Sequence, residues 1–318
     1  MVDSSQLAKS KSIHRKTGKT FYYATQLLPE RVRHPTYVLY AFFRIADEVV
    51  DNPNGLTPEE QHERLIEIRE ASLGRETATD PVLKAFCEVR ERYGIPETEI
   101  EEFIDAMRTD IETSRYETYD ELEAYMRGSA AAVGVMMTII METDNVDVAL
   151  PKARRLGEAF QLTNFLRDVG EDIADRDRIY LPRTTLEAYG ADPEDIERQQ
   201  FTEEIGRAIE RELKRAEKLY REGVSGIRHL PEDCRLPVLT AAVLYADHHR
   251  LIRERNNDTI TETPSLGTFR KLSLVAKTWG YWKLHKDPES VFAKVSDIPM
   301  SEEDLPPKAY PRDSLPMN

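Results

Sequence analysis

The sequence predicts an all-α fold, and three observations support that prediction. Apolar residues recur with a helical period from Phe21 to about Trp282. Proline and glycine fall mostly between the periodic segments. No run of alternating apolar and polar residues is long enough to build a sheet. No linker divides the periodic text, so we expect a single helical domain.

The expected helices follow one another along the chain at short intervals. Their expected ranges are 31–51, 58–73, 80–94, 97–114, 119–143, 147–175, 203–228, 235–254 and 266–283. Thr57 precedes Pro58 and Asp80 precedes Pro81, and both pairs are typical of helix starts. We expect residues 1–19 to form a flexible N-terminal segment, 20–284 the domain, and 285–318 a polar, proline-rich tail without regular structure.

The composition favours a globular protein and argues against some partners. The chain has 318 residues, of which 40% are hydrophobic and 32% charged, and its formal net charge is −14. Such acidity argues against general nucleic-acid binding, which needs a basic surface. The longest apolar run, residues 130–141, is shorter than the ~20 residues of a membrane span. With no signal-peptide pattern, we expect a cytoplasmic protein with peripheral membrane contact at most.

Two helical segments carry a line of polar residues through apolar text. The segments are 36–51 and 154–172. The first stripe consists of Tyr40, Arg44, Asp47 and Asp51, within an arc of about 60° at 100° per residue. The second stripe consists of Gln161, Asn164, Asp168 and Asp172, within about 80° by the same rule.

The two stripes are more informative than a single acidic pair. Because Asp and Glu make up 58 of 318 residues, isolated acidic pairs at i and i+4 arise by chance and usually face solvent. Here, two such pairs are each extended by further polar residues and embedded in apolar text. Buried carboxylates are costly unless they are paired or bind a cation. The stripes therefore indicate a lined cavity.

The residue types in the stripes point to a particular ligand chemistry. Oxygen ligands without a partner His or Cys favour a hard cation such as Mg²⁺. Mg²⁺ is commonly held by few carboxylates together with substrate phosphates, which suits opposed aspartate pairs around a diphosphate. The nearby basic residues Arg44, Arg167, Arg176 and Arg178 are suited to phosphate oxygens. An apolar cavity beside them would hold a hydrocarbon chain.

Other constellations in the sequence are weaker. Glu59 and His62 form one Glu-x-x-His, whereas a di-iron bundle needs two. His248 and His249 stand on a charged helix, where we expect them to be solvated. The small residues from Ser129 to Gly134 would let either another helix or a ligand approach closely. No glycine-rich phosphate loop and no G-x-S-x-G motif occurs.

The two stripe segments also resemble a known family. YAFFRIADEVVDNPN (residues 40–54) and QLTNFLRDVGEDIADRDRIYLP (residues 161–182) resemble the two aspartate motifs of the squalene/phytoene synthase family. Weaker similarities lie in residues 18–30, in the D-x-x-x-x-R-Y of residues 110–116, in Tyr125 followed by SAAAVG, and in residues 236–249. The similarity runs from about residue 18 to 283 in the family's order.

The resemblance implies a fold and a set of site residues. The fold would be the isoprenoid synthase helical bundle with a central cavity. Asp47, Asp51, Asp168 and Asp172 would be catalytic and would bind Mg²⁺, with Asn164 as a further ligand. Residues that would contact the diphosphate or the prenyl chain are Lys19, Thr20, Phe21, Tyr40, Arg44, Tyr125, Gln161, Arg167, Tyr180 and Tyr245.

The resemblance also implies a reaction. The chain would be a prenyltransferase of carotenoid biosynthesis that condenses two geranylgeranyl diphosphates head to head through a cyclopropyl diphosphate. It would need Mg²⁺, or Mn²⁺ in its place, and no NADPH. One alternative is a C15 relative that makes dehydrosqualene or squalene. Another is a non-catalytic helical assembly factor, which would be expected to lose carboxylates, and all four are present.

Overall fold

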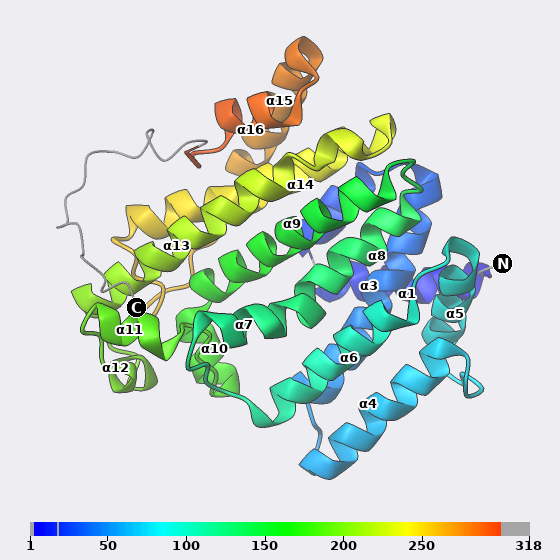
Figure 1. Ribbon diagram of the computed structural model, residues 1–318, viewed down its shortest axis with the longest axis horizontal. Helices are drawn as coiled ribbons and strands as arrows, with labels where there is room; N and C mark the ends of the chain where they lie inside the picture. The colour runs from blue at the N-terminus through cyan, green and yellow to red at the C-terminus, as the bar shows by residue number, and fades with distance from the viewer. Residues whose placement is uncertain (1–2, 18, 300–318) are drawn as a thin grey trace.

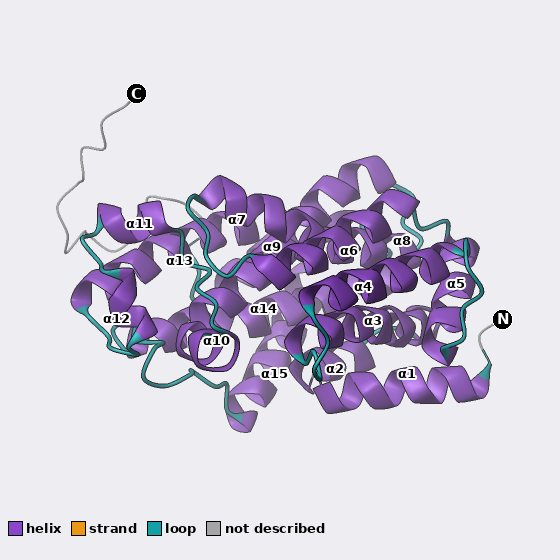
Figure 2. Ribbon diagram, turned by 90° about the horizontal axis from the view of Figure 1, so that it is seen from below, coloured by secondary structure: helices purple, strands orange, loops and turns teal. Residues whose placement is uncertain are grey.

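The computed structural model describes residues 3–17 and 19–299, excluding the side chains of residues 17, 19–21 and 23. Within this part of the chain every regular element is a helix (Figure 2). The one extended pairing recorded there is an isolated bridge between Arg115 and Ile179. The prediction of an all-α fold is confirmed.

Most helices lie side by side in a bundle (Figure 1). The first half contains α1 (Ser4–Thr17), α2 (Lys19–Gln26), α3 (Glu30–Asp51), α4 (Pro58–Leu73), α5 (Pro81–Tyr93), α6 (Glu97–Glu112), α7 (Tyr119–Met126), a π-helical segment (Arg127–Ala131) and α8 (Ala132–Ile140). The second half contains α9 (Val146–Arg167), α10 (Val169–Arg176), α11 (Arg183–Ala188), α12 (Pro193–Glu197), α13 (Glu203–Val224), a 3₁₀ turn (Ile227–His229), α14 (Glu232–Glu254), α15 (Thr268–His285) and α16 (Pro288–Val295).

Helix α3 shows how the bundle presents the first stripe. Its apolar face is fully buried at Val38 and Phe42, and the Phe42 ring stacks on that of Phe86 in α5 with 3.9 Å between centroids. At 100° per residue this face lies opposite the first stripe. Burial of one side of α3 therefore leaves its polar side free to meet other helices, and Asp51 at its end contacts Arg176 of α10.

Both ends of the described chain differ from the expectation. Helix α1 packs against α3 and α5 along one edge of the bundle (Figure 2), where a flexible segment was expected. Its buried side chains are Gln6, Ser10 and His14. Because these residues are polar, the sequence of α1 shows no apolar stripe by which a helix could be predicted. Helix α16 buries Val291 and Phe292, where an unstructured tail was expected. Eight residues are too few for a clear periodic pattern. Residues 300–318 lie outside the described part.

The expected helix 147–175 is interrupted at Asp168, where α9 ends and α10 begins. The amide of Gly170 donates to the carbonyl of Thr259 at 3.0 Å, and a Cβ on Gly170 would collide with the backbone of Ile260. The close passage of residues 259–260 accounts for the break. The amide of Asp172 still donates to the carbonyl of Asp168 at 2.7 Å, so the two aspartates remain one turn apart.

The small residues around the start of α8 form a tight helix crossing. A Cβ on Gly157 of α9 would lie 2.5 Å from the carbonyl oxygen of Ala130, and one on Gly134 would lie 2.5 Å from that of Ala153. The sequence allowed either another helix or a ligand to approach Ser129–Gly134 closely. In the structure, the helix α9 makes this approach. Among the described helices, none is both long and apolar enough to cross a bilayer.

The Gly157→Ala substitution tests this crossing. Because the added methyl group would press on the backbone at Ala130, we expect the free energy of unfolding to fall by roughly 1–3 kcal/mol in urea titrations. Gly280→Ala in α15 is the matched control, since a Cβ there meets nothing within 4 Å. Alanine at Gly280 should leave stability unchanged or raise it by up to ~1 kcal/mol. Equal stability of the two variants would contradict the tight crossing.

Candidate active site

The two stripes face each other, and Arg176 lies between them. Its Nε is 3.4 Å from Oδ1 of Asp51 at the end of α3, and its Nη1 is 3.1 Å from Oδ1 of Asp172 in α10. One guanidinium thus contacts a carboxylate from each stripe. The opposed arrangement of the aspartate pairs is a property of the tertiary structure, since these segments are far apart in the sequence.

Arginines also accompany the other carboxylates. Asp51 lies 3.4 Å from Nη1 of Arg44 and 3.7 Å from Nη1 of Arg178, and Arg44 is 3.7 Å from Oδ2 of Asp47. Arg167 donates to both oxygens of Asp168, at 2.6 and 2.5 Å. The guanidinium groups therefore offset part of the carboxylate charge. Their fork geometry also suits phosphate oxygens.

Like charges stand close together within each stripe. Burial, followed by the neighbouring Asp51, raises the pKa of Asp47 to about 7. Burial, followed by Asp168, raises the pKa of Asp172 to about 7. The Asp47 side chain is 37% exposed, so solvent offsets part of its burial, whereas the Asp172 side chain is only 12% exposed. A proton or a cation would relieve the repulsion in both pairs.

The donor set fits a divalent cation that prefers oxygen ligands. Among the described residues, no three Asp, Glu, His or Cys side chains form a cage for a metal by themselves. The carboxylates come instead as two repelling pairs, with Arg44, Arg167 and Arg176 beside them. Mg²⁺ is commonly bound by one or two carboxylates, with substrate phosphates and water in its remaining positions. The stripes suit that mode of binding.

Tyr125 and Tyr180 belong to an aromatic wall beside the carboxylates. The Tyr125 hydroxyl donates to Oδ2 of Asp110 at 2.6 Å, and the Tyr180 ring stacks on Phe165 at 3.7 Å and lies 6.0 Å from the Tyr125 ring. Arg178 links this wall to the first stripe, because its Nη1 lies 3.6 Å from Asp110 and 3.7 Å from Asp51. Burial raises the pKa of Asp110 to about 6. In the sequence, Asp110 begins the D-x-x-x-x-R-Y motif, but no function was predicted for it.

The remaining predicted residues lie on α2, α9, α3 and α14. Tyr245 stacks on Phe160 at 4.6 Å, and its pKa is raised by burial, with Tyr40 and Asp168 close enough to contribute. Tyr40 of the first stripe and Asp168 of the second are thus both electrostatic neighbours of Tyr245. Gln161 and Asn164 are half-buried on α9. Lys19, Thr20 and Phe21 start α2, and their side chains lie outside the described part.

His14 was missed by the sequence analysis because α1 was expected to be loose. Its imidazole stacks on the Tyr40 ring at 3.9 Å, and Tyr37 packs edge-on at 5.8 Å. Burial lowers the pKa of His14 to about 3, so the ring is neutral. Helix α1 thereby supports the first residue of the first stripe. The polar spacing of Gln6, Ser10 and His14 was the available signal.

The expectation that His248 and His249 are solvated is wrong. Both are buried, because α14 is covered by α9, α13, α15 and α16. Nε2 of His249 lies 3.0 Å from Oγ1 of Thr163 on α9, and its Nδ1 lies 3.5 Å from Oε1 of Glu217 on α13. This buried network holds α9 in place at Thr163. Asn164, a residue of the second stripe, directly follows Thr163 in the chain.

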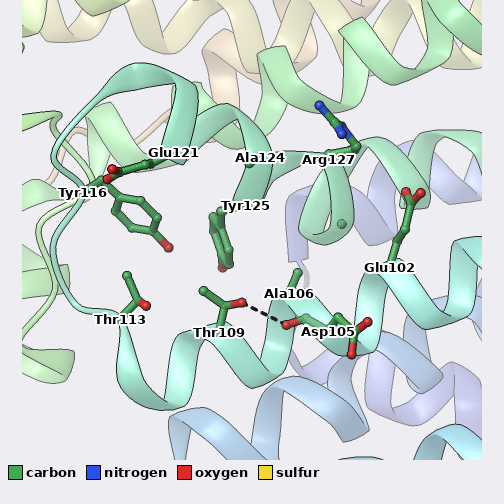
Figure 3. A pocket seen from close by; sticks show the side chains of 11 residues that line it. Glu102, Asp105, Ala106, Thr109, Thr113, Tyr116, Glu121, Ala124, Tyr125 and Arg127 are labelled. Carbon is green, nitrogen blue, oxygen red and sulfur yellow. Dashed lines mark hydrogen bonds between the residues drawn. The ribbon is translucent and has the colours of Figure 1, made fainter.

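A pocket of about 550 Å³ lies between α6 and the α7–π-helical segment (Figure 3). Tyr116 and Tyr125 project towards it, and Glu102, Asp105 and Glu121 are among its other lining residues. Of the predicted site residues that the structure describes, Tyr125 is the one that lines it. The pocket therefore borders the aromatic wall and is separate from the aspartate stripes. The central cavity implied by the resemblance stays a prediction.

Comparison with known sequences agrees with this geometry. The sequence model of the family described as squalene/phytoene synthase matches residues 14–274. The phytoene synthase of Rhodobacter capsulatus is 34% identical over 285 residues, covering 87% of this chain and 82% of the relative. The 15-cis-phytoene synthase of a Synechocystis species is 30% identical over 273 residues, covering 82% of this chain and 81% of the relative.

Solved structures show the same architecture. A dehydrosqualene synthase crystallised with a ligand is 29% identical, with a TM-score of 0.78 over 88% of this chain and 98% of that chain. A squalene synthase from Alicyclobacillus acidocaldarius is 23% identical, with a TM-score of 0.71 over 79% of this chain and 94% of that chain. The latter similarity concerns the fold alone.

The raised pKa of Asp172 predicts how stability depends on pH. Its folded pKa of about 7 exceeds its usual 3.8, so between these values the folded state binds more protons and is destabilised as pH rises. Asp172→Asn should remove this loss, so that between the two ends of that range the variant gains on the order of 4 kcal/mol of unfolding free energy relative to wild type, in urea titrations without metal. The exposed Asp175→Asn on the same helix is the control. Parallel pH profiles for wild type and Asp172→Asn would contradict the assignment.

Proposed function

The chain belongs to the squalene/phytoene synthase family, and we propose that it condenses two molecules of geranylgeranyl diphosphate head to head to give phytoene. The resemblance inferred from the two aspartate motifs is confirmed by the family match over residues 14–274. The observation that carries the proposal is the contact of Arg176 with Asp51 and Asp172, which joins the two repelling aspartate pairs around the proposed diphosphate site.

The aspartates would bind divalent metal, and the arginines would bind phosphate. We propose that Asp47, Asp51, Asn164, Asp168 and Asp172 hold Mg²⁺, with Mn²⁺ as a substitute. Bound metal would neutralise the diphosphate charge and assist its departure. The arginines that would turn from carboxylate to phosphate oxygens are Arg44, Arg167, Arg176 and Arg178.

The tyrosines and the polar residues of the stripes would orient the substrates. Tyr40, Tyr125, Tyr180 and Tyr245 present rings and hydroxyls around the carboxylates, as suits an allylic cation flanked by apolar chains. Gln161, Lys19, Thr20 and Phe21 are proposed as further substrate contacts. No side chain is required as a nucleophile, because the acceptor's own double bond attacks the donor carbon.

The proposed reaction is balanced without a reductant. In the first half, the donor C–O bond breaks, pyrophosphate leaves, the acceptor double bond attacks C1, and loss of a proton closes the cyclopropane of prephytoene diphosphate. In the second half, another pyrophosphate leaves, the carbon skeleton rearranges, and a second proton is lost to give the linear hydrocarbon. Since no hydride is consumed, NADPH is not needed, whereas a squalene synthase requires it.

A C15 relative remains the nearest alternative. The structural similarity to a dehydrosqualene synthase, at 29% identity over 88% of this chain, favours a shared mechanism. The curated relatives named phytoene synthase, at 30–34% identity over more than four fifths of the chain, favour the C20 substrate. A non-catalytic assembly factor has no comparable support.

The aspartate assignment predicts the behaviour of two variants. Asp47→Asn and Asp168→Asn should each lower the rate of hydrocarbon formation by at least about 100-fold, because a ligand charge is lost from the metal and diphosphate site. The fold should be kept, as judged by circular dichroism, because relief of like-charge repulsion does not destabilise the bundle.

Asp175→Asn is the matched control for these variants, since it makes the same chemical change at an exposed position on α10. It should retain wild-type activity. A wild-type rate in either Asp47→Asn or Asp168→Asn would remove that residue from the proposed metal site. Loss of activity together with unfolding would show a structural role instead.

Substrate choice is tested by direct competition. Purified protein with Mg²⁺ and equal amounts of farnesyl and geranylgeranyl diphosphate should form mainly the C40 hydrocarbon. If the cavity accepts the longer chain, every buried CH₂-sized group of an added isoprene unit contributes about 0.8 kcal/mol to the binding free energy. Product identification by mass spectrometry is the measurement. Activity should vanish in excess EDTA and be unaffected by omission of NADPH. Mainly C30 product would assign the chain to the C15 relatives.

A further inference from the structure

Helix α15 lies at the outside of the bundle and is attached by one face. Leu274, Thr278 and Trp282 are buried on that face, and α15 packs against α14 and α16. Arg270 reinforces the attachment, because its Nη2 lies 2.5 Å from Oδ1 of the buried Asp247 on α14. In Figure 1, α14 lies between α15 and α9.

The opposite face of α15 is apolar and open to solvent. Phe269 is 91% exposed, Leu272 62% and Trp279 55%, and Ala276 between them is also exposed. At 100° per residue these four side chains fall within an arc of about 80°, opposite the buried face. We call Phe269, Leu272, Ala276 and Trp279 the outer face of α15.

The charge around the outer face is the reverse of the charge on the whole chain. The chain carries −14, yet residues 263–286 contain no Asp or Glu. The basic residues of this segment are Arg270, Lys271, Lys277, Lys283 and Lys286. Lys277 and Lys283 are exposed, and the Lys283 ammonium lies 5.1 Å from the centre of the Trp279 ring. Aromatic and cationic groups therefore share one surface.

We propose that the outer face of α15 docks on an anionic lipid bilayer. Helices that lie in a membrane interface combine Trp, Phe and Leu on one side with Lys and Arg around them, and anionic headgroups attract the cations. Phe269 and Trp279 would enter the acyl boundary, while Lys277 and Lys283 would reach the headgroups along their aliphatic stems. The helix lies parallel to the surface and does not span the bilayer.

Charge distinguishes this occupant from a second copy of the chain. A symmetric dimer through the outer face would place the lysines of one copy against those of the other, which is unfavourable. The lipid surface supplies the opposite charge over the whole length of the helix, about 27 Å for 18 residues. The inference goes beyond the proposed function and does not depend on it, because it rests on α15 alone.

Vesicle co-sedimentation with the full chain is the main test. Wild type should bind vesicles of phosphatidylcholine mixed with phosphatidylglycerol, and bind pure phosphatidylcholine more weakly. Phe269→Ser with Trp279→Ser should lower partitioning at least about tenfold on both, since apolar burial is lost. Lys277→Gln with Lys283→Gln should lower it about 30-fold on the anionic vesicles only.

Matched controls keep the result specific to α15. Leu56→Ser removes another exposed leucine, and Lys84→Gln with Lys218→Gln removes two exposed lysines from α5 and α13. These variants should bind like wild type. All substituted side chains are exposed, so circular dichroism and thermal unfolding should match wild type for every variant.

Tryptophan fluorescence locates the contact, because both tryptophans of the chain, Trp279 and Trp282, lie in α15. Anionic vesicles should shift the emission to the blue, and lipids brominated on their acyl chains should quench it. Trp279→Phe should remove most of the quenching while co-sedimentation persists. The proposal is overturned if wild type does not bind anionic vesicles, if the controls lose binding equally, or if sedimentation velocity shows that the outer face forms a dimer instead.

Discussion

Four carboxylates from two distant segments can stand together in this fold because guanidinium groups lie between them. Asp51 and Asp172 share Arg176, and Asp168 is held by Arg167. Without these cations, burial and mutual repulsion would force the aspartates to be protonated or separated. The same arginines suit phosphate oxygens, so the interaction that holds the carboxylates together also fits the proposed binding of a diphosphate and its metal.

The arrangement also depends on how closely helix α9 is held. Gly157 lets α9 approach the backbone at Ala130 on one side. On another side, Thr163 is hydrogen-bonded within the buried cluster of Tyr220 and His249. Tight crossings and buried polar networks leave few alternative registers for a helix. The second stripe, carried by α9 and α10, is consequently directed at α3 rather than at solvent.

Helix α14 connects the candidate site with the proposed membrane surface. Tyr245 lies near Tyr40 and Asp168, while Asp247, two residues later and on the other side of the helix, binds Arg270 of α15. Under the proposed function, both the substrates and the hydrocarbon product carry long apolar chains. Exposure of these chains to water is unfavourable. A bilayer contact one helix away from the site would shorten the path that they travel through water.

The sequence by itself determined the all-α class, most helix bounds within α3 to α15 and the membership of each polar stripe, because a helix repeats its faces every 3.6 residues. It also indicated the family through residues 40–54 and 161–182. Only the tertiary structure decided that the stripes meet across Arg176, that the helix breaks at Asp168, and that α1 supports Tyr40 through His14. Local periodicity shows which residues share a face. What that face contacts depends on distant segments, such as residues 259–260 beside Gly170. Polar side chains such as those of His14 and His249 become buried only when such segments cover them.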